Sequence, residues 1–509
     1  MSIENTPILV GAGQCVVRDI QTPEEVLTPV ELAARAAELA LADTGCEGLA
    51  EHIDTLVMIR LMLDSARSYK HPFGTSNKPP LSVAQRIGAN PRRLVYGHLG
   101  GQSPQRTVNE LAEAIFNGES KAALICGSEA TAAMKQALRN QWQLDWSETL
   151  EGDIEDKGIQ RLQTDVELTH GATFPLQVYA LFENAWRVKH GLSVAEHQAL
   201  MAKLFAPFSE VAAQNPYSQY PVARDEEFLA NASKENFPIN IPYHKWLVAQ
   251  DAVNQGASVV MTSVGMAKKL GIPESQWVYL HGYADADDTW VSERPDLGRS
   301  NALAAALNQA LKQAGKSIAD MDLVDIYSCF PIAVLAACDA MGLDWETNKG
   351  LTVTGGLPFF GGPGNSYSLH AIAEVATRLR EMPGQFGLIS ANGGFLSKQS
   401  VGVYSTEPVK EWKPADTGAA QQLVDAQETV EVLPSYQGEG EIETYSFVYA
   451  KGQPVNAFIV GRVEGGKKRF LAKVKEGDSE TLQAIESQEP IGRKVVVNAA
   501  ESGNEFTLV

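Results

Sequence analysis

One segment pattern occurs twice in this chain of 509 residues, and it constrains the fold more than any other feature. Residues 31–57 contain an Ala/Leu-rich run that ends at Gly45, followed by an acidic turn and a short apolar stretch. Residues 301–324 repeat this order, with Gly315 at the end of the run. The second run carries leucines on one helix face, at Leu303, Leu307 and Leu311. Because a glycine after such a run is typical of a helix C-cap, we predict two similar helix–turn–strand units.

Each half continues with a strand, a glycine-containing turn, a helix and a second strand. In the first half we predict strands at 94–96 and 122–126 and a helix at 105–117 between them. In the second half the strands are expected at 351–353 and 387–390, and the helix at 366–381. This alternation predicts an α/β sheet with helices on its faces, in two halves related by a pseudo-two-fold axis. We expect the two helices to lie side by side at the centre.

Three further segments depart from this pattern. The first half covers residues 1–270 and the second half covers residues 271–405. Residues 130–250 are helical and aromatic, and we interpret them as a loop region inserted into the first half. Residues 406–428 have the composition of a linker. Residues 429–509 contain short alternating strands, at 440–450, 455–463, 468–474, 493–498 and 505–509. This last segment is predicted to be an additional β-rich domain, a small five-stranded barrel similar to an OB fold.

Charge and composition argue against several classes of partner. Lys plus Arg number 42 and Asp plus Glu number 62, so the formal net charge is −20, which disfavours nucleic acids and anionic membranes. The longest apolar runs, such as residues 329–338, hold about ten residues, against the ~18–20 that a membrane span needs. Five cysteines, an odd number, and an N-terminus without basic residues or a long apolar core fit a soluble cytoplasmic protein.

The sequence lacks the common cofactor motifs. No GxGxxG follows a strand, no GxxxxGK[ST] occurs, and the spacing of cysteines and histidines offers no zinc site. We therefore expect neither a nucleotide cofactor nor a metal. Four of the cysteines lie in apolar or loop contexts and are interpreted as structural, namely Cys15, Cys46, Cys126 and Cys338.

Five short motifs occur in order along residues 6–405. They are Gln102-Ser103-Pro104 ahead of a helix, Asn215-Pro216-Tyr217-Ser218-Gln219-Tyr220, Gln255-Gly256-Ala257, Tyr327-Ser328-Cys329-Phe330 and the glycine loop at 355–363. In these motifs the chain resembles the thiolase superfamily, and within it the sterol-carrier-protein type of thiolase. The resemblance implies a duplicated, five-layered α-β-α-β-α fold, an acyl-CoA or related thioester as substrate, and no cofactor besides the coenzyme A of that thioester. The β-rich domain lies outside the resemblance and looks like the extra domain of some thiolase-like proteins.

The departures from the family pattern fall on its catalytic residues. Thiolases have a nucleophilic cysteine at a helix N-terminus, where the helix dipole and amide donors favour the thiolate. The resemblance gives this position to Gly101, the histidine of the Gly-His-Pro loop to Gly362, and the second cysteine to a place near Ala391. The usual Cys–His–Cys chemistry is therefore expected to be missing.

Three residues are candidates for replacing this chemistry. Cys329 is a candidate nucleophile, because it follows a strand and precedes the helix start at Phe330-Pro331. Free amides at such a helix start lower the pKa of a thiol. The alternative is a buried structural cysteine. His370, on the helix after the glycine loop, is a candidate general base, and the alternative is a surface or capping histidine. Asn365 is a candidate oxyanion-hole donor or a helix N-cap, and both roles are compatible.

The remaining candidates are expected to line a substrate pocket. They are His98, Gly101, Ser103, Gly362, Asn392, Gly393 and Gly394. The Asn-Gly-Gly sequence is also consistent with an ordinary turn, and His98 with a structural role.

Two functions stay open at this point. The first is an acyltransferase of the thiolase superfamily that acts on acyl-CoA thioesters with a rearranged site. The second is a non-catalytic acyl- or CoA-binding protein that retains the fold. For either function we expect a monomer or homodimer whose partner is a small-molecule thioester, with no nucleic acid and no membrane.

Overall fold

A ten-stranded mixed sheet runs through the first four fifths of the chain in the computed structural model, which describes residues 3–347, 350–450 and 452–509. The first half contributes β1 (Pro7–Val16), β2 (Thr55–Met58), β3 (Arg93–Tyr96), β4 (Ala122–Ala130), β5 (Glu155–Asp156) and β6 (Asn254–Ser263). The second half contributes β7 (Val278–Asp287), β8 (Leu323–Ile326), β9 (Phe386–Gly393) and β10 (Lys398–Ser405). The strands are arranged in the order β5-β3-β2-β4-β6-β1-β7-β10-β9-β8.

The two halves meet where β1 pairs antiparallel with β7, at Ile8–Tyr279 and Leu9–Val278. Moving outward from this junction, the first half has the order β1-β6-β4-β2 and the second half has the order β7-β10-β9-β8. Strands at equivalent positions of the two halves, namely β1 and β7, β6 and β10, β4 and β9, and β2 and β8, thus follow one another in the same order. This confirms the duplicated α/β fold that the repeat predicts.

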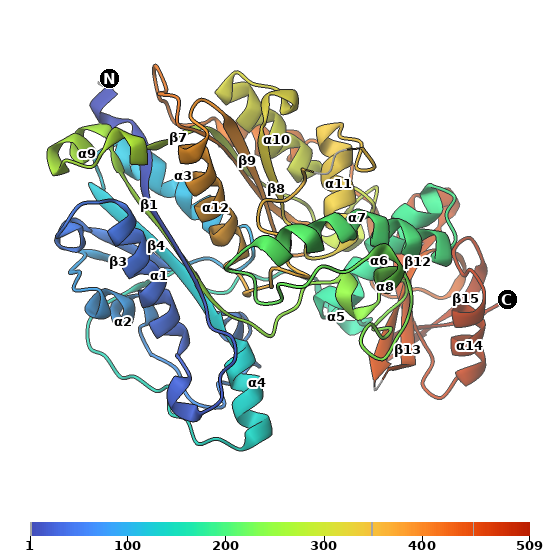
Figure 1. Cartoon of the computed structure of the whole chain (residues 1–509). Coiled ribbons are helices and arrows are strands. Elements are labelled where there is room, and N and C mark those ends of the chain that lie inside the picture. Colours follow the sequence, from blue (N-terminus) through green and yellow to red (C-terminus); the bar gives the residue numbers. More distant parts are fainter. Residues whose placement is uncertain (1–2, 348–349, 451) are drawn as a thin grey trace.

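Helices form three layers around the two half-sheets (Figure 1). The helices α3 (Ser103–Phe116) and α12 (Tyr367–Glu381) contact each other and strands of both halves, so they lie side by side between the half-sheets, as predicted. The repeated helices α1 (Pro29–Asp43) and α10 (Asn301–Ala314) cover the outer faces. These contacts give the α-β-α-β-α layering.

Equivalent glycines let the outer helices pack closely on the sheet. A side chain at Gly11 of β1 would collide with the backbone oxygen of Ala40 in α1. A side chain at Gly282 of β7 would collide in the same way with the backbone oxygen of Ala310 in α10. The alanine-rich faces of the two helices are buried at these contacts, which explains why both copies of the repeat are rich in small residues.

One predicted strand is wrong. Residues 351–353 form no strand, although their counterpart in the first half is β3. The buried carboxylate of Asp325 accepts hydrogen bonds from the amide of Val353 at 2.9 Å and the amide of Thr354 at 3.2 Å. Because these amides bind a side chain, they are not available to a neighbouring strand.

The insertion after β4 is mainly helical. It contains α4 (Thr131–Asn140), α5 (Asp165–Thr169), α6 (Pro175–Lys189), α7 (Val194–Gln214) and α8 (Glu226–Ala230). The remaining helices of the α/β halves are α2 (Pro79–Arg86), α9 (Val264–Leu270) and α11 (Pro331–Met341). The helix α6 contacts α11 on one side and the C-terminal domain on the other.

The C-terminal domain is a closed five-stranded barrel, as predicted. Its strands are β12 (Gly438–Ala450), β13 (Gln453–Val463), β14 (Lys468–Val474), β15 (Lys494–Ala500) and β16 (Gly503–Leu508). The barrel closes where β14 pairs in parallel with β16. Three elements were not predicted: β11 (Glu431–Leu433), α14 (Ser479–Ser487), and α13 (Thr417–Asp425), which lies within the segment expected to be a linker.

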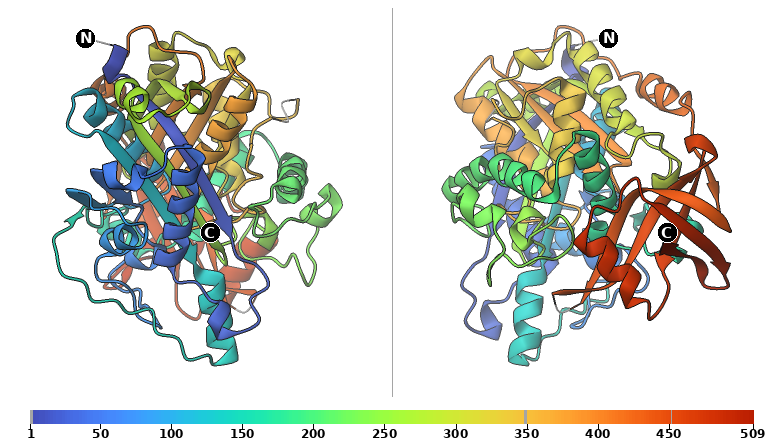
Figure 2. Two further views of the ribbon diagram at one scale, coloured as in Figure 1. Left: turned by 60° about the vertical axis from the view of Figure 1, so that its left-hand side comes forward. Right: turned by 90° about the vertical axis from the view of Figure 1, so that its right-hand side faces the viewer.

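The barrel is packed against the insertion (Figure 2). Thr444 donates a 2.6 Å hydrogen bond to the backbone oxygen of Leu181, and Asn184 donates one of 3.2 Å to the backbone oxygen of Tyr445. The fully buried Arg187 forms an ion pair of 2.7 Å with Glu489. These buried polar contacts fix the barrel to α6. Over the described part of the chain, no helix is long and apolar enough to cross a membrane.

Candidate functional site

Gly101 lies in the turn between β3 and α3, at the position that the resemblance gives to a nucleophilic cysteine. A Cβ atom at Gly101 would lie 2.5 Å from Cε2 of Tyr327, and closer still to its Cζ and hydroxyl oxygen. Non-bonded carbon atoms in proteins do not approach each other so closely. The ring of Tyr327 therefore occupies the space that a nucleophile side chain would need. Sequence reasoning predicts that the nucleophilic cysteine is missing, but it did not identify Tyr327 as the side chain in this space.

The Gly101 turn is held by the start of α12. The amide of Gly100 donates a 3.0 Å hydrogen bond to Oδ1 of Asn365, and Ser368 donates one of 2.7 Å to the backbone oxygen of Gly101. The Nδ2 of Asn365 donates to the backbone oxygen of Arg60 at 2.8 Å and to Oγ of Ser65 at 3.1 Å. Both amide hydrogens of Asn365 are thus used inside the protein, and neither is left for a thioester oxygen.

The buried side chain of Gln102 fills the space next to this turn. It lies between Gly100 and Gly393, and a Cβ atom at Gly393 would be 2.7 Å from Cδ of Gln102. Its Nε2 donates a 3.0 Å hydrogen bond to the backbone oxygen of Leu99, whereas Oε1 has no hydrogen-bond partner among the described residues. Glycine at position 393 is therefore needed to make room for Gln102.

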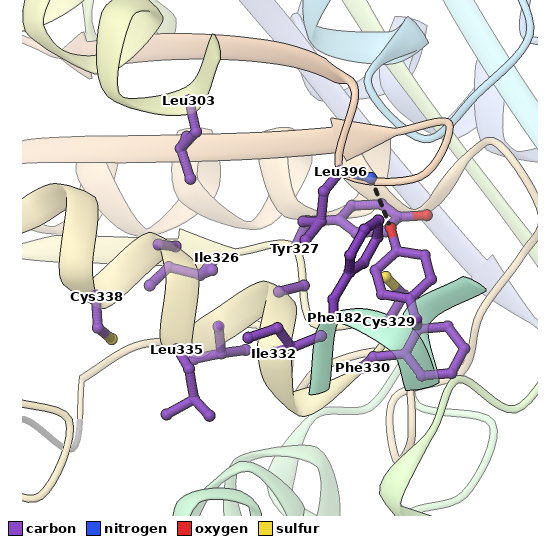
Figure 3. Packing of buried hydrophobic residues seen from close by; sticks show 14 of the residues in the cluster. Phe182, Leu303, Ile326, Tyr327, Cys329, Phe330, Ile332, Leu335, Cys338 and Leu396 are labelled. Atoms are coloured by element: carbon purple, nitrogen blue, oxygen red, sulfur yellow. Dashed lines mark hydrogen bonds between the residues drawn. The ribbon is translucent and has the colours of Figure 1, made fainter. Parts of the chain in front are cut away.

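Cys329 lies between β8 and α11 in an aromatic cluster (Figure 3), where its sulfur is near Phe182 and Phe330. Its Sγ accepts hydrogen bonds from the hydroxyl of Tyr179 and, at 3.8 Å, from Nδ2 of Asn392. Although these donors favour the thiolate, burial has the larger effect and raises the pKa of the Cys329 thiol to about 12. The thiol is protonated at neutral pH.

Tyr179, on α6 of the insertion, organises the group around Cys329. Its hydroxyl accepts hydrogen bonds from Nδ2 of Asn392 at 2.9 Å and from the amide of Leu396 at 3.3 Å. Asn392 in turn accepts a 3.1 Å hydrogen bond from Nε2 of Gln399. Sequence reasoning did not identify Tyr179, because nothing in the pattern of α6 indicates that its tyrosine faces a turn about two hundred residues away.

His370 is fully buried on α12 and faces β1. Its Nδ1 lies 2.8 Å from Oε1 of Gln14, and Nε2 has no partner among the described residues. The ring packs edge-on against Phe360, with 5.1 Å between the ring centroids. Burial lowers the pKa of His370 to about 3, so the ring is neutral. Over the described residues no hydrogen bond joins His370 to Cys329.

The other candidate residues lie on several different segments, and not all of them are buried. Gly362 lies against the segment 249–250, whose first amide donates a 2.9 Å hydrogen bond to the backbone oxygen of Cys329. Gly394 follows Gly393 in the turn after β9. The Oγ of Ser103 is buried at the start of α3 without a partner among the described residues. His98 instead lies 3.1 Å from Glu110 at the partly exposed side of α3.

The residues described by the structure contain no group of three or more His, Cys, Asp or Glu side chains arranged to hold a metal ion. The groups around Gly101 and Cys329 are buried and neutral: the side chains of Tyr327 and Gln102 and the protonated Cys329. His370, also buried and neutral, faces Gln14 of β1 instead.

A family model described as the additional C-terminal domain of thiolase-like protein type 1 matches residues 420–502. The crystal structure of a monomeric SCP2-thiolase-like protein type 1 from Mycobacterium smegmatis is 40% identical, and the match covers 100% of both chains with a TM-score of 0.85. Human mitochondrial 3-ketoacyl-CoA thiolase in complex with CoA is 20% identical and matches 80% of this chain and 100% of its own, with a TM-score of 0.55.

A curated relative, the acetyl-CoA acetyltransferase of Methanothermobacter thermautotrophicus, is 24% identical over 262 residues. That match covers 47% of this chain and 65% of the relative, slightly less than two thirds of its length. The match to the mycobacterial protein thus includes the barrel, whereas the match to the human enzyme covers four fifths of this chain and the match to the curated relative about half of it.

Proposed function

Because this chain belongs to the SCP2-thiolase-like protein type 1 family of the thiolase superfamily, we propose that it binds an acyl-CoA thioester without the cysteine-based acyl transfer of thiolases. One observation carries the proposal: the ring of Tyr327 fills the place of the nucleophile at Gly101. A covalent acyl-enzyme cannot form at a glycine, and the surrounding space has no room for a side chain.

The thioester part of the proposal is supported by the relatives. Both the curated relative and the human enzyme carry names that refer to acyl-CoA compounds, and the human structure is a complex with CoA. The similarity of fold to the human enzyme covers 80% of this chain, in which α3 and α12 lie between the two half-sheets.

The protonation states argue against turnover. A thiolate, not a thiol, attacks a thioester, and burial keeps Cys329 protonated. The candidate base His370 is neutral, and its Nε2 has no partner among the described residues. However, its Nδ1 lies against Oε1 of Gln14, and its ring faces β1 rather than Cys329. A base must come within hydrogen-bond distance of the proton that it removes.

A second candidate, acyl transfer at Cys329, is favoured by one specific observation. Its sulfur accepts hydrogen bonds from Tyr179 and Asn392, and donors of this kind stabilise a thiolate once a substrate has entered. In that case Asn392 and Tyr179 would orient the sulfur and shape the acyl pocket.

The test combines binding and turnover on the full chain. Coenzyme A, acetyl-CoA, acetoacetyl-CoA and a long-chain acyl-CoA are titrated by calorimetry, and mass spectrometry follows both thioester consumption and covalent adducts. We expect saturable binding of at least one thioester, with no consumption and no adduct. Failure of all four compounds to bind would refute the proposal.

Consumption that is lost in Cys329→Ser but kept in Cys338→Ser would favour the second candidate. Cys338 is a suitable control because it is a buried cysteine on α11, close to Cys329 in sequence. Consumption that persists in both variants would refute both candidates.

A further inference from the structure

The side chain of Gln102 fills a narrow slot next to Gly101. The slot lies between two glycine turns, one at Gly100 and the other at Gly393. A Cβ atom at Gly100 would lie 3.1 Å from Cδ of Gln102, and a Cβ atom at Gly393 would lie 3.1 Å from the backbone nitrogen of Gly101. The two turns therefore meet beside Gln102, and its side chain leaves no room for another group between them.

Hydrogen bonds hold both walls of the slot in place. On one wall, the amide of Gly100 donates to Asn365 at 3.0 Å, and the hydroxyl of Ser368 donates to the backbone oxygen of Gly101 at 2.7 Å. On the other wall, Gly393 is the last residue of β9 and pairs with Lys398 of β10. Because a space with fixed walls collapses only partly when its contents are removed, a smaller residue at position 102 would leave a cavity.

The amide group of Gln102 is only half satisfied, although the residue is fully buried. Its Nε2 donates a 3.0 Å hydrogen bond to the backbone oxygen of Leu99, whereas Oε1 has no partner among the described residues. A buried acceptor without a donor is unfavourable. The surroundings of Oε1 therefore suit an alkyl carbon better than a carbonyl oxygen.

Tyr327 and Gln102 together fill the space on two sides of Gly101. The ring of Tyr327 occupies the place of a side chain at position 101, and Gln102 occupies the slot beside it. In the proposed function the acyl group of a thioester is directed to this turn, since the resemblance gives Gly101 the position of the thiolase nucleophile. The two side chains thus fill the space that the acyl group would need.

We propose that Gln102 is a plug that keeps the acyl group of a bound thioester out of the slot between Gly100 and Gly393. The protein then recognises the coenzyme A part of the ligand and does not select for the acyl chain. This inference rests on the proposed function and adds a residue that determines specificity. An emptied slot, with few donors around it, would hold a short alkyl chain.

The insertion supplies a loosely held cover next to the slot. A Cβ atom at Gly394 would lie 3.5 Å from Cδ2 of Leu162, so the segment 158–163 packs on the turn that contains Gly393. In the described part of the chain this segment forms no hydrogen bond between backbone groups, and it begins at Gly158 with a φ angle of 74°. A segment held by so few bonds opens at a low free-energy cost, which gives a ligand a route to the slot.

Calorimetry on the full chain tests the plug by comparing coenzyme A with butyryl-CoA, which carries a short acyl chain. In the unmodified protein we expect the two dissociation constants to agree within about threefold, because the acyl chain stays outside the slot. In Gln102→Ala we expect butyryl-CoA to bind roughly tenfold more tightly than coenzyme A, the effect of burying about two methylene groups. Gln102→Ser opens the same slot and keeps the test valid if Gln102→Ala does not fold.

Gln102→Met is the matched control, because it keeps the slot filled by a side chain of similar size. Its two dissociation constants should agree as they do in the unmodified protein. The control separates the loss of volume from the loss of the amide group, since only the alanine and serine variants empty the slot.

Three results would overturn the inference and leave the proposed function standing. They are a tenfold or larger preference for butyryl-CoA in the unmodified protein, equal affinities in both Gln102→Ala and Gln102→Ser, and an equal gain in Gln102→Met. Binding of butyryl-CoA by the alanine or serine variant alone would support the plug and refute the proposed function of the unmodified chain. If no variant binds either compound, both proposals fail.

Discussion

The overlap between position 101 and Tyr327 predicts a strong coupling between two substitutions. Gly101→Ala adds one carbon atom, which would lie 2.5 Å from Cε2 of Tyr327, against an ordinary contact distance of 3.4–4 Å. The φ angle of Gly101 is not among the positive ones, so the backbone itself accepts alanine. The cost is therefore one of overpacking, about 1–3 kcal/mol.

The Tyr327 ring has little freedom to move aside. The ring packs edge-on against Tyr367, with 5.4 Å between the ring centroids. The backbone of Tyr327 is also held, because its amide donates a 2.9 Å hydrogen bond to the backbone oxygen of Ser390. Tyr327→Ala removes the ring and should cost about 3–5 kcal/mol, as for other large buried aromatic side chains. In that background Gly101→Ala should cost almost nothing, because the space is empty.

Urea unfolding of the four proteins, followed by far-ultraviolet circular dichroism, measures this double-mutant cycle. We expect an interaction free energy of about 1–3 kcal/mol between the two sites. Gly418→Ala in α13 is the control: its Cβ would approach no atom closer than 3.5 Å, and the substitution should be neutral or slightly stabilising. If the two costs add within about 0.5 kcal/mol, Tyr327 does not occupy the nucleophile position and the main support for the proposed function is lost.

Three further predictions concern buried titratable groups. Iodoacetamide should modify Cys46, which is partly exposed, before Cys329, whose thiol has a pKa of about 12; peptide mapping that finds equal rates would contradict this burial. The pKa of His370 lies near 3 in the fold against 6.5 when unfolded, so the unfolded chain binds an extra proton and stability falls as the pH drops from 6.5 toward 3. This fall in the free energy of unfolding should amount to about 5 kcal/mol across the range, and His370→Gln should abolish it in urea unfolding curves; an unchanged pH profile in the variant would argue against the assignment. The pKa of the buried Glu129 carboxyl is raised from 4.5 to about 8. The stability that the fold gains from this protonated carboxyl is therefore fully present below pH 4.5 and is lost as the pH rises toward 8. Glu129→Gln should therefore be more stable than the unmodified protein at pH 8 by a few kcal/mol, with little difference at pH 4.5; the opposite order would disprove the assignment.

The parts of the fold that sequence predicts well are those encoded by neighbouring residues. Gly45 and Gly315 end their helical runs, and both adopt positive φ angles, 69° and 63°. The alternation of apolar residues in the last segment is likewise local, and it predicts each strand of the barrel within a few residues. The missing strand at 351–353 shows the limit of such patterns, because the competing carboxylate of Asp325 lies 28 positions before Val353.

The candidate site depends on contacts between distant segments. Cys329 and His370 come from neighbouring strand–turn–helix units, but the rotation of α12 turns His370 toward Gln14, 356 positions away in sequence. Similarly, Tyr179 reaches Asn392 from an inserted helix, 213 positions before it. A single sequence carries no signal for such pairings, whereas the absence of a cysteine at Gly101 is visible at once.

The central place of β1 in the sheet has a consequence for biosynthesis. This strand leaves the ribosome before its partners β6 and β7, which begin about 240 and 260 residues after its end. At typical synthesis rates of roughly 5–20 residues per second, Ile8, Leu9 and Val10 wait about 10–50 s for the strands that bury them. During this interval the nascent chain presents an unpaired apolar strand, so productive folding depends on keeping it from other chains until translation has passed β7.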